Sequence, residues 1–248
     1  MEIYYYNINE IGEQAQVSRA EQRLAAAGWN ERIAASARFR MEKDRKRCLC
    51  AGLALLDALE DRGIRPSAVL KTRDGKPYLE KDPEFHFNLS HSGDYAVCAV
   101  WEREVGIDIQ EIRDPEPSLL RYCCTEQEQE RIRKSVFPAS AFTATWSWKE
   151  AFMKMTGRGL RIRPEEIEVL LPPWTEEEIR GEMLPGSGEE AVHENTARLY
   201  GKLPLRASAA GLRPAGKEVS GDFRDIVLYE GVLGGMPVCV CGKLPGQS

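Results

Sequence analysis

Three charged residues of this sequence are candidates for chemistry, one as a metal ligand and two as a pair on one helix face. The first is Asp108, which lies in the run Val-Gly-Ile-Asp-Ile-Gln ending at residue 110. The alternation of apolar residues at 105, 107 and 109 predicts a strand, with Asp108 and Gln110 on the face away from the core. Aspartate is disfavoured among β-branched residues, which makes Asp108 a candidate metal ligand; an aspartate that caps a turn or meets water is the alternative.

Glu150 and Lys154 are the other two residues, in the run Trp-Ser-Trp-Lys-Glu-Ala-Phe-Met-Lys-Met-Thr-Gly from 146 to 157. Their spacing of four residues places them on one face of a predicted helix, where the two side chains can meet. The alternative is an ordinary surface ion pair, which contributes only roughly a few tenths of a kcal/mol.

A histidine among hydroxyl groups is a further candidate. His91 lies in Ser90-His91-Ser92, at the end of a predicted strand. Such a histidine can bind phosphate, orient a metal-bound group or transfer a proton, although a lone histidine at a turn is more often structural. The basic turn Gly75-Lys76-Pro77 adds a cation but lacks the spacing of a P-loop.

The elements that must position these residues are a mixture of strands and helices. Strand patterns occur at Ile3–Ile8, Val69–Lys71, 85–90, Tyr95–Trp101 and Val105–Ile109. The last three strands follow one another across short turns, which predicts an antiparallel meander. Helical patterns cover Ser18–Glu60, Ser118–Tyr122, Glu126–Lys134 and Phe142–Met155, followed by strand-like runs at 167–171, 226–229 and 238–241.

An internal echo indicates two similar α+β halves. The run from Gly93 to Val100 resembles that from Gly234 to Cys241, and each is a turn followed by an apolar strand. The generic composition of buried strands is the alternative explanation.

Four motifs occur in a compact order: GKP at 75–77, FNLSHSG at 87–93, VGIDI at 105–109 and WSWKEAFMKMTGRGL at 146–160. This series resembles the motifs of the 4′-phosphopantetheinyl transferases. The length of the chain and its division into two halves resemble the surfactin-synthetase-activating (Sfp) type of this family. The resemblance implies an α+β fold of two similar halves related by a pseudo-twofold axis. The expected halves are residues 1–105 and 106–248, with the active site in the cleft between them.

The resemblance also implies an activity. Members of the family transfer the phosphopantetheine arm of coenzyme A to a serine of an acyl, peptidyl or aryl carrier protein and release 3′,5′-ADP. By motif position, Asp108 and Glu150 hold Mg²⁺ or Mn²⁺, Lys154 grips the reacting phosphate, and Glu150 accepts the serine proton. The implied coenzyme A contacts are Arg32, Lys71, Lys76, Asn88, Ser90 and His91, with Arg32 at the 3′-phosphate.

One position departs from the family pattern. Many Sfp-type members carry a carboxylate where this sequence has Gln110, and a neutral amide is a poorer Mg²⁺ ligand. We therefore expect a water molecule in that position and weaker metal affinity. A non-catalytic module that binds coenzyme A or a carrier protein is the second hypothesis, and an α+β protein with coincidental motifs is the third.

Composition limits the other function classes. The chain of 248 residues carries a net charge of −5, has no apolar run long enough to span a membrane and lacks a secretory signal. We therefore expect a cytoplasmic monomer without nucleic-acid or membrane partners, in which the seven cysteines are reduced packing residues. The basic clusters Lys43–Arg47 and Arg131–Lys134 could meet an acidic carrier protein or be solvated helix faces; the carrier itself stays open.

Overall fold

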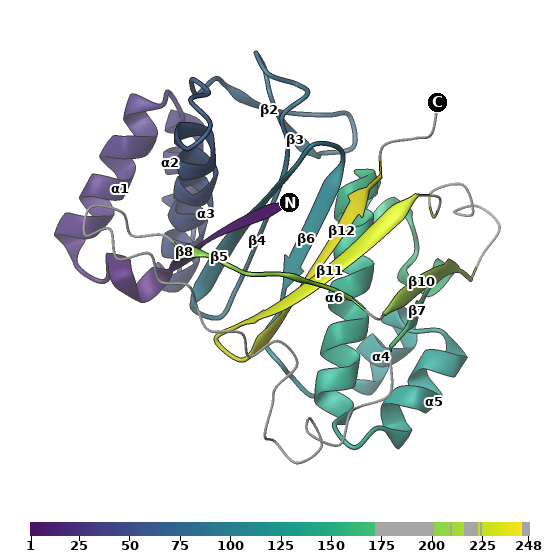
Figure 1. Ribbon diagram of the computed structural model, residues 1–248. Helices are drawn as coiled ribbons and strands as arrows, with labels where there is room; N and C mark the ends of the chain where they lie inside the picture. The colour runs from purple at the N-terminus through teal and green to yellow at the C-terminus, as the bar shows by residue number, and fades with distance from the viewer. Residues whose placement is uncertain (172–200, 209, 216–222, 224, 245–248) are drawn as a thin grey trace. The chain divides into compact units, whose positions relative to one another are not determined.

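The computed structural model describes residues 1–171, 201–208, 210–215, 223 and 225–244 (Figure 1). Contacts within the chain divide it into two compact units. The first unit consists of Met1–Glu102 and, of the later part of the chain, the described residues 201–204. The second unit consists of the other described residues from Arg103 onward.

A four-stranded antiparallel sheet forms the frame of the first unit. Its order is β4-β5-β1-β8, with β1 at Glu2–Asn7, β4 at His86–Ser92, β5 at Tyr95–Trp101 and β8 at Gly201–Lys202. The tyrosine-rich run of β1 is strongly β-prone, and it lies in the interior of the sheet between β5 and β8. A separate hairpin pairs β2 (Val69–Lys71) with β3 (Pro77–Leu79).

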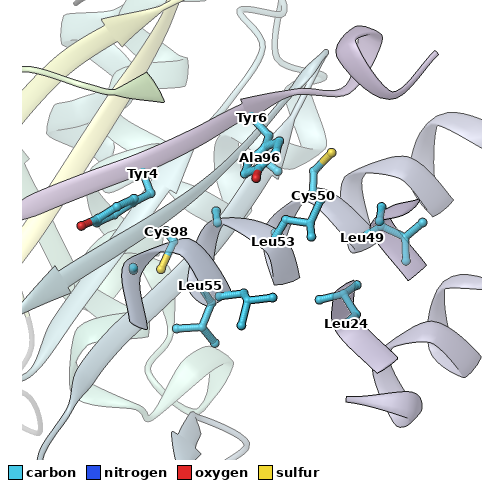
Figure 2. Packing of buried hydrophobic residues seen from close by; sticks show 14 of the residues in the cluster. Tyr4, Tyr6, Leu24, Leu49, Cys50, Leu53, Leu55, Ala96 and Cys98 are labelled. Atoms are coloured by element: carbon cyan, nitrogen blue, oxygen red, sulfur yellow. The ribbon is translucent and has the colours of Figure 1, made fainter. Parts of the chain in front are cut away.

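Helix α3 (Glu42–Glu60) is the centre of this unit's core. It contacts β1, β4 and β5, and it also contacts α1 (Gln14–Ala26) and α2 (Asn30–Ser36). Because it is covered by both the sheet and the helices, its residues from Leu49 to Leu59 are all buried. Figure 2 shows side chains of α3 in one cluster with Tyr4 and Tyr6 of β1 and with Cys98 of β5.

The second unit repeats this plan. Its four-stranded sheet has the order β6-β12-β11-β9, with β6 at Val105–Ile109, β9 at Arg206–Ala207, β11 at Ile226–Leu233 and β12 at Met236–Lys243. Helix α6 (Pro138–Thr156) packs on β6 and β12, and Gly157 ends it in the left-handed conformation (φ 71°). The remaining elements are α4 (Pro117–Cys123), α5 (Glu126–Lys134), the short 3₁₀ turns Ile8–Ile11 (first unit), Gly159–Arg161 and Pro164–Glu166, and the pair β7 (Ile167–Leu170) and β10 (Gly211–Pro214).

The internal echo is confirmed as a structural repeat. In each unit a glycine with positive φ, Gly93 (54°) or Gly234 (56°), begins the two-residue turn that leads into the second strand of a hairpin. That strand pairs on its other edge with the first strand of the same unit, and the register matches: Cys98 lies opposite Tyr4, and Cys239 lies opposite Asp108. The predicted α+β class is therefore confirmed, whereas the domain boundary and the twofold relation stay predictions.

The predicted three-stranded meander is wrong in its third strand. β4 and β5 form the expected hairpin, but β6 pairs with β12 instead of β5. The physical reason is that β4 and β1 occupy both edges of β5, so β5 has no edge left for β6. The chain therefore leaves the first sheet at Trp101 and begins the second sheet at Val105.

The helical pattern predicted from Ser18 to Glu60 corresponds to three separate helices. Gly28 has φ 80°, a conformation that ends α1, and residues 37–41 separate α2 from α3. In the described part of the chain, no helix combines the length and the apolar character needed to cross a membrane.

Candidate active site

Asp108, Glu150 and Lys154 come together in the second unit. The Lys154 ammonium lies 2.6 Å from Asp108 Oδ1 and 3.6 Å from Glu150 Oε2. Strand β6 supplies the aspartate and α6 supplies the other two residues, which share a helix face at the predicted spacing of four. The pair is therefore not an ordinary surface pair, because its lysine also binds a carboxylate on a different element.

Asp108 is buried, contrary to the prediction that it faces away from the core. Its side chain is only 5% exposed, because α6 packs on β6. Gly106, on the same face of the strand, allows this approach: a Cβ at Gly106 would overlap the Ala151 carbonyl oxygen and the Met155 amide nitrogen of α6. Both faces of β6 are buried. The alternation of apolar residues correctly predicted one buried face, but it wrongly predicted that the face of Asp108 is exposed.

Burial and charge set the protonation of this group. Burial raises the pKa of the Glu150 carboxyl, against the opposing effect of Lys154. Burial alone would lower the pKa of Lys154, but the Asp108 and Glu150 carboxylates outweigh it, and the net shift is upward. Lys154 therefore stays charged at neutral pH, while Glu150 is biased toward accepting a proton.

Lys149, next to Glu150, was not singled out from the sequence, and the structure gives it an anchoring position. Its ammonium is fully buried and donates to Glu128 Oε2 (2.6 Å), to the Cys123 carbonyl (2.7 Å) and to the Pro164 carbonyl (3.0 Å). These bonds tie α6 to α4, α5 and the Pro164 turn. The sequence carried a signal for it, because Lys149 is three and four residues from the core residues Phe152 and Met153 of α6.

The strand β4 residues divide between two faces. Asn88 and Ser90 are buried and lie on one face with Ser92, whereas His91 is exposed on the other face, which also carries Phe87 and Leu89. Phe87 and Leu89 pack in the core with α3. Adjacent side chains on a strand point to opposite faces, so Ser90 and His91 lie on different faces of the hairpin.

Arg32 belongs to α2, and its side chain lies across α3. Its Nη1 donates to the Cys48 carbonyl (3.1 Å), and its side chain passes so close to Gly52 that a Cβ there would overlap Arg32 Cδ. Lys71 and Lys76 lie at the same end of the β2–β3 hairpin, where Lys71 is opposite Pro77. The first unit thus carries Arg32, Lys71, Lys76, Asn88, Ser90 and His91, and the second carries the acidic pair with Lys154.

Comparison with known families decides the classification. A family model described as 4′-phosphopantetheinyl transferase, N-terminal, matches residues 17–103, and one described as the 4′-phosphopantetheinyl transferase superfamily matches residues 104–203. The 4′-phosphopantetheinyl transferase psf-1 of Bacillus pumilus is 32% identical over 165 residues, which cover 64% of this chain and 70% of that protein. This chain belongs to the 4′-phosphopantetheinyl transferase superfamily.

Other members of the superfamily are similar over different lengths of the chain. The 4′-phosphopantetheinyl transferase HetI of Nostoc is 33% identical over 164 residues, which cover 61% of this chain and 68% of HetI. The human L-aminoadipate-semialdehyde dehydrogenase-phosphopantetheinyl transferase is 36% identical over 119 residues, 42% of this chain and 38% of the human protein. The resemblance inferred from the four motifs is therefore confirmed.

The basic cluster Lys43–Arg47 is engaged within its own unit of this transferase. The bonds are Lys43 to Asp94 (3.0 Å), Arg45 to Glu21 (2.6 Å), Lys46 to Glu42 (2.6 Å) and Arg47 to Asp44 (2.7 Å). In the cluster Arg131–Lys134, Arg131 donates to the Val169 carbonyl (2.7 Å) and Lys134 pairs with Glu130 (2.6 Å). Each of these cations has an internal partner, which weakens both clusters as docking surfaces for an acidic carrier protein.

The cysteines have the character of packing residues. All seven are free, and every one except the partly buried Cys48 is buried. Burial raises the pKa of Cys50 to about 12 and that of Cys123 to about 11, so their thiols are protonated at neutral pH. Within the described residues, no group of three or more His, Cys, Asp or Glu residues is placed to hold a metal ion.

Proposed function

We propose that this chain transfers the 4′-phosphopantetheine arm of coenzyme A to a serine hydroxyl of a carrier protein, with Asp108, Glu150 and Lys154 as its catalytic residues. Membership of the superfamily supports the reaction. The observation that supports the assignment of residues is the position of Lys154 between the Asp108 and Glu150 carboxylates. Lys154 is partly buried and about a quarter exposed, so its ammonium is held in place by two carboxylates and can still meet a charged phosphate.

The donor set fits a magnesium ion. Mg²⁺ binds hard oxygens and is usually held by one or two protein carboxylates together with phosphate oxygens and water. Asp108 and Glu150 supply two such carboxylates from a strand and a helix that pack together, and both lie within reach of one ammonium group. The bound ion would neutralise charge on the pyrophosphate of coenzyme A.

The side chains then carry out the transfer. The serine oxygen forms a bond to the phosphorus that bears the pantetheine arm, and the bond from that phosphorus to the bridging oxygen breaks. That oxygen leaves with 3′,5′-ADP, and Lys154 stabilises the negative charge on it. Glu150, with its raised pKa, accepts the proton of the serine hydroxyl.

We further propose that both units contribute to the binding of coenzyme A. Arg32, Lys71, Lys76, Asn88, Ser90 and His91 of the first unit contact its nucleotide and phosphates, and the second unit contacts the reacting pyrophosphate. In this proposal the predicted half 1–105 binds the nucleotide and phosphates, and the predicted half 106–248 binds the reacting pyrophosphate. Neither half should then transfer phosphopantetheine alone.

Mass spectrometry of a carrier protein incubated with coenzyme A, Mg²⁺ and this chain tests the proposal. We expect the carrier to gain the mass of one phosphopantetheine, and Asp108→Asn and Glu150→Gln each to lower turnover by about 100-fold or more. Absence of the mass gain across fatty-acid, polyketide and peptide carriers would contradict the proposal. Calorimetric binding of coenzyme A without transfer would instead identify a non-catalytic module.

A further inference from the structure

The turn between β4 and β5 is held by two cations of helix α3. Gly93 and Asp94 form this two-residue turn, in which Gly93 takes φ 54°. Arg47 Nε donates to the Gly93 carbonyl at 2.7 Å, and Lys43 Nζ lies 3.0 Å from Asp94 Oδ1. Both cations lie in the first two turns of α3, so the N-terminal end of this helix is bonded to the turn of the hairpin.

The opposite side of the turn is held as well. The Ile8 amide donates to the Asp94 carbonyl at 2.8 Å, and Asn9 Nδ2 donates to Asp94 Oδ2 at 3.1 Å. Lys43 and Asn9 together lower the pKa of Asp94, which keeps its carboxylate charged. A turn of two residues thus receives four bonds from two other segments of the first unit.

The second unit contains a hairpin with a turn of the same length. The turn Gly234–Gly235 joins β11 and β12 across the same two-residue gap. The two turns differ in their neighbours along the chain, since Ser90 and His91 precede only the first. The bonds from Arg47 and Lys43 to the Gly93–Asp94 turn, which we call the clamp, therefore lie directly beside the candidate coenzyme A residues.

Strand β4 needs such support for a physical reason. Among the described strands it stands at the edge of its sheet, next to β5, and the ends of edge strands are the parts of a sheet that open most readily. His91 is exposed one residue before the end of β4, on the face that packs against α3 further along the strand. Movement of the turn would therefore displace His91 and Ser90 relative to α3 and to Arg32 of α2, whose side chain packs on α3.

We propose that Arg47 and Lys43 are positioning residues, which fix the β4–β5 turn on α3 and so preorganise Ser90 and His91 for the phosphates of coenzyme A. This inference rests on the proposed function. Arg47 acts through the backbone of Gly93, and its Nη1 is occupied by Asp44 (2.7 Å). Its loss should weaken the binding of coenzyme A and leave the chemical step, which lies with Glu150 and Lys154, almost intact.

The test compares Arg47→Met with Arg45→Met. Arg45 lies on the same helix, and its ion pair of 2.6 Å is with Glu21 of α1 and not with the hairpin. We expect Arg47→Met to raise the KM for coenzyme A by about 10-fold with kcat within about 2-fold, because the loss of binding shared by the ground state and the transition state raises KM and spares kcat. Arg45→Met should change neither constant, and Arg47→Lys should recover part of the loss.

The outcomes separate the clamp from the proposed function. If the unaltered chain transfers phosphopantetheine but Arg47→Met keeps its KM, or lowers only kcat, the clamp is a stability device and the inference fails. If Arg45→Met raises KM equally, the effect belongs to α3 as a whole, and the inference also fails. If the unaltered chain binds coenzyme A without transfer, calorimetric dissociation constants replace KM; if it does not bind, both proposals fail.

Discussion

Replacement of Lys149 by methionine is the perturbation whose effect the structure defines most closely. The Lys149 ammonium donates to three acceptors, and neither it nor Glu128 is exposed beyond 1%. Glu128 also accepts from the Thr125 amide at 2.7 Å and from the Val169 amide at 2.7 Å, so its carboxylate cannot turn to solvent. Lys149→Met would therefore leave a charged carboxylate buried without its cation.

The cost follows from this uncompensated charge. Removal of one partner of a buried ion pair typically costs about 3–5 kcal/mol. Methionine refills most of the volume of the lysine stem, which keeps the cavity contribution small, so we expect a loss of about 3 kcal/mol. At about 2–4 °C per kcal/mol for a chain of this size, the melting temperature should fall by about 6–12 °C.

Thermal unfolding followed by circular dichroism provides the assay, with Lys134→Met as the matched control. Lys134 pairs with Glu130 at 2.6 Å, but both side chains are mostly exposed, and such pairs contribute at most about 1 kcal/mol. Adding Glu128→Gln to Lys149→Met should recover at least about 1 kcal/mol, because it removes the buried charge. A Lys149→Met variant as stable as Lys134→Met would refute the anchoring role of Lys149.

Three further substitutions test the site. Gly106→Ala should lower both stability, by about 1–3 kcal/mol, and turnover, because a Cβ there overlaps the α6 backbone; unchanged unfolding and kinetics would contradict that close approach. Gly52→Ala should displace Arg32 and raise the KM for coenzyme A by about 10-fold, while the KM for dephospho-coenzyme A, which lacks the 3′-phosphate, should not change. An equal rise in both KM values would show that Arg32 does not bind the 3′-phosphate. Gln110→Glu should lower the Mg²⁺ concentration that gives half-maximal turnover, and an unchanged Mg²⁺ dependence would show that residue 110 lies outside the metal site.

Local features were predictable because their signals are local. Alternation and turn residues placed the strands Val69–Lys71, Tyr95–Trp101 and Val105–Ile109 at their observed bounds, and the capping box of Thr125 and Glu128 marks the start of α5. The helix spacing of Glu150 and Lys154 placed these side chains on one face before any tertiary contact was known. The order of the four motifs identified the superfamily.

The sequence by itself determined the family, the local elements and the residue types available for chemistry. The tertiary structure decided which edge β6 joins, that Asp108 is buried beneath α6, and that the cations of Lys43–Arg47 are used inside the first unit. These outcomes depend on contacts between residues far apart in the chain, since β6 meets β12 after more than a hundred residues. The periodicity of apolar residues shows which face of a helix or strand is apolar. It does not show what packs on that face or pairs with that edge, because this depends on the positions of all the other elements.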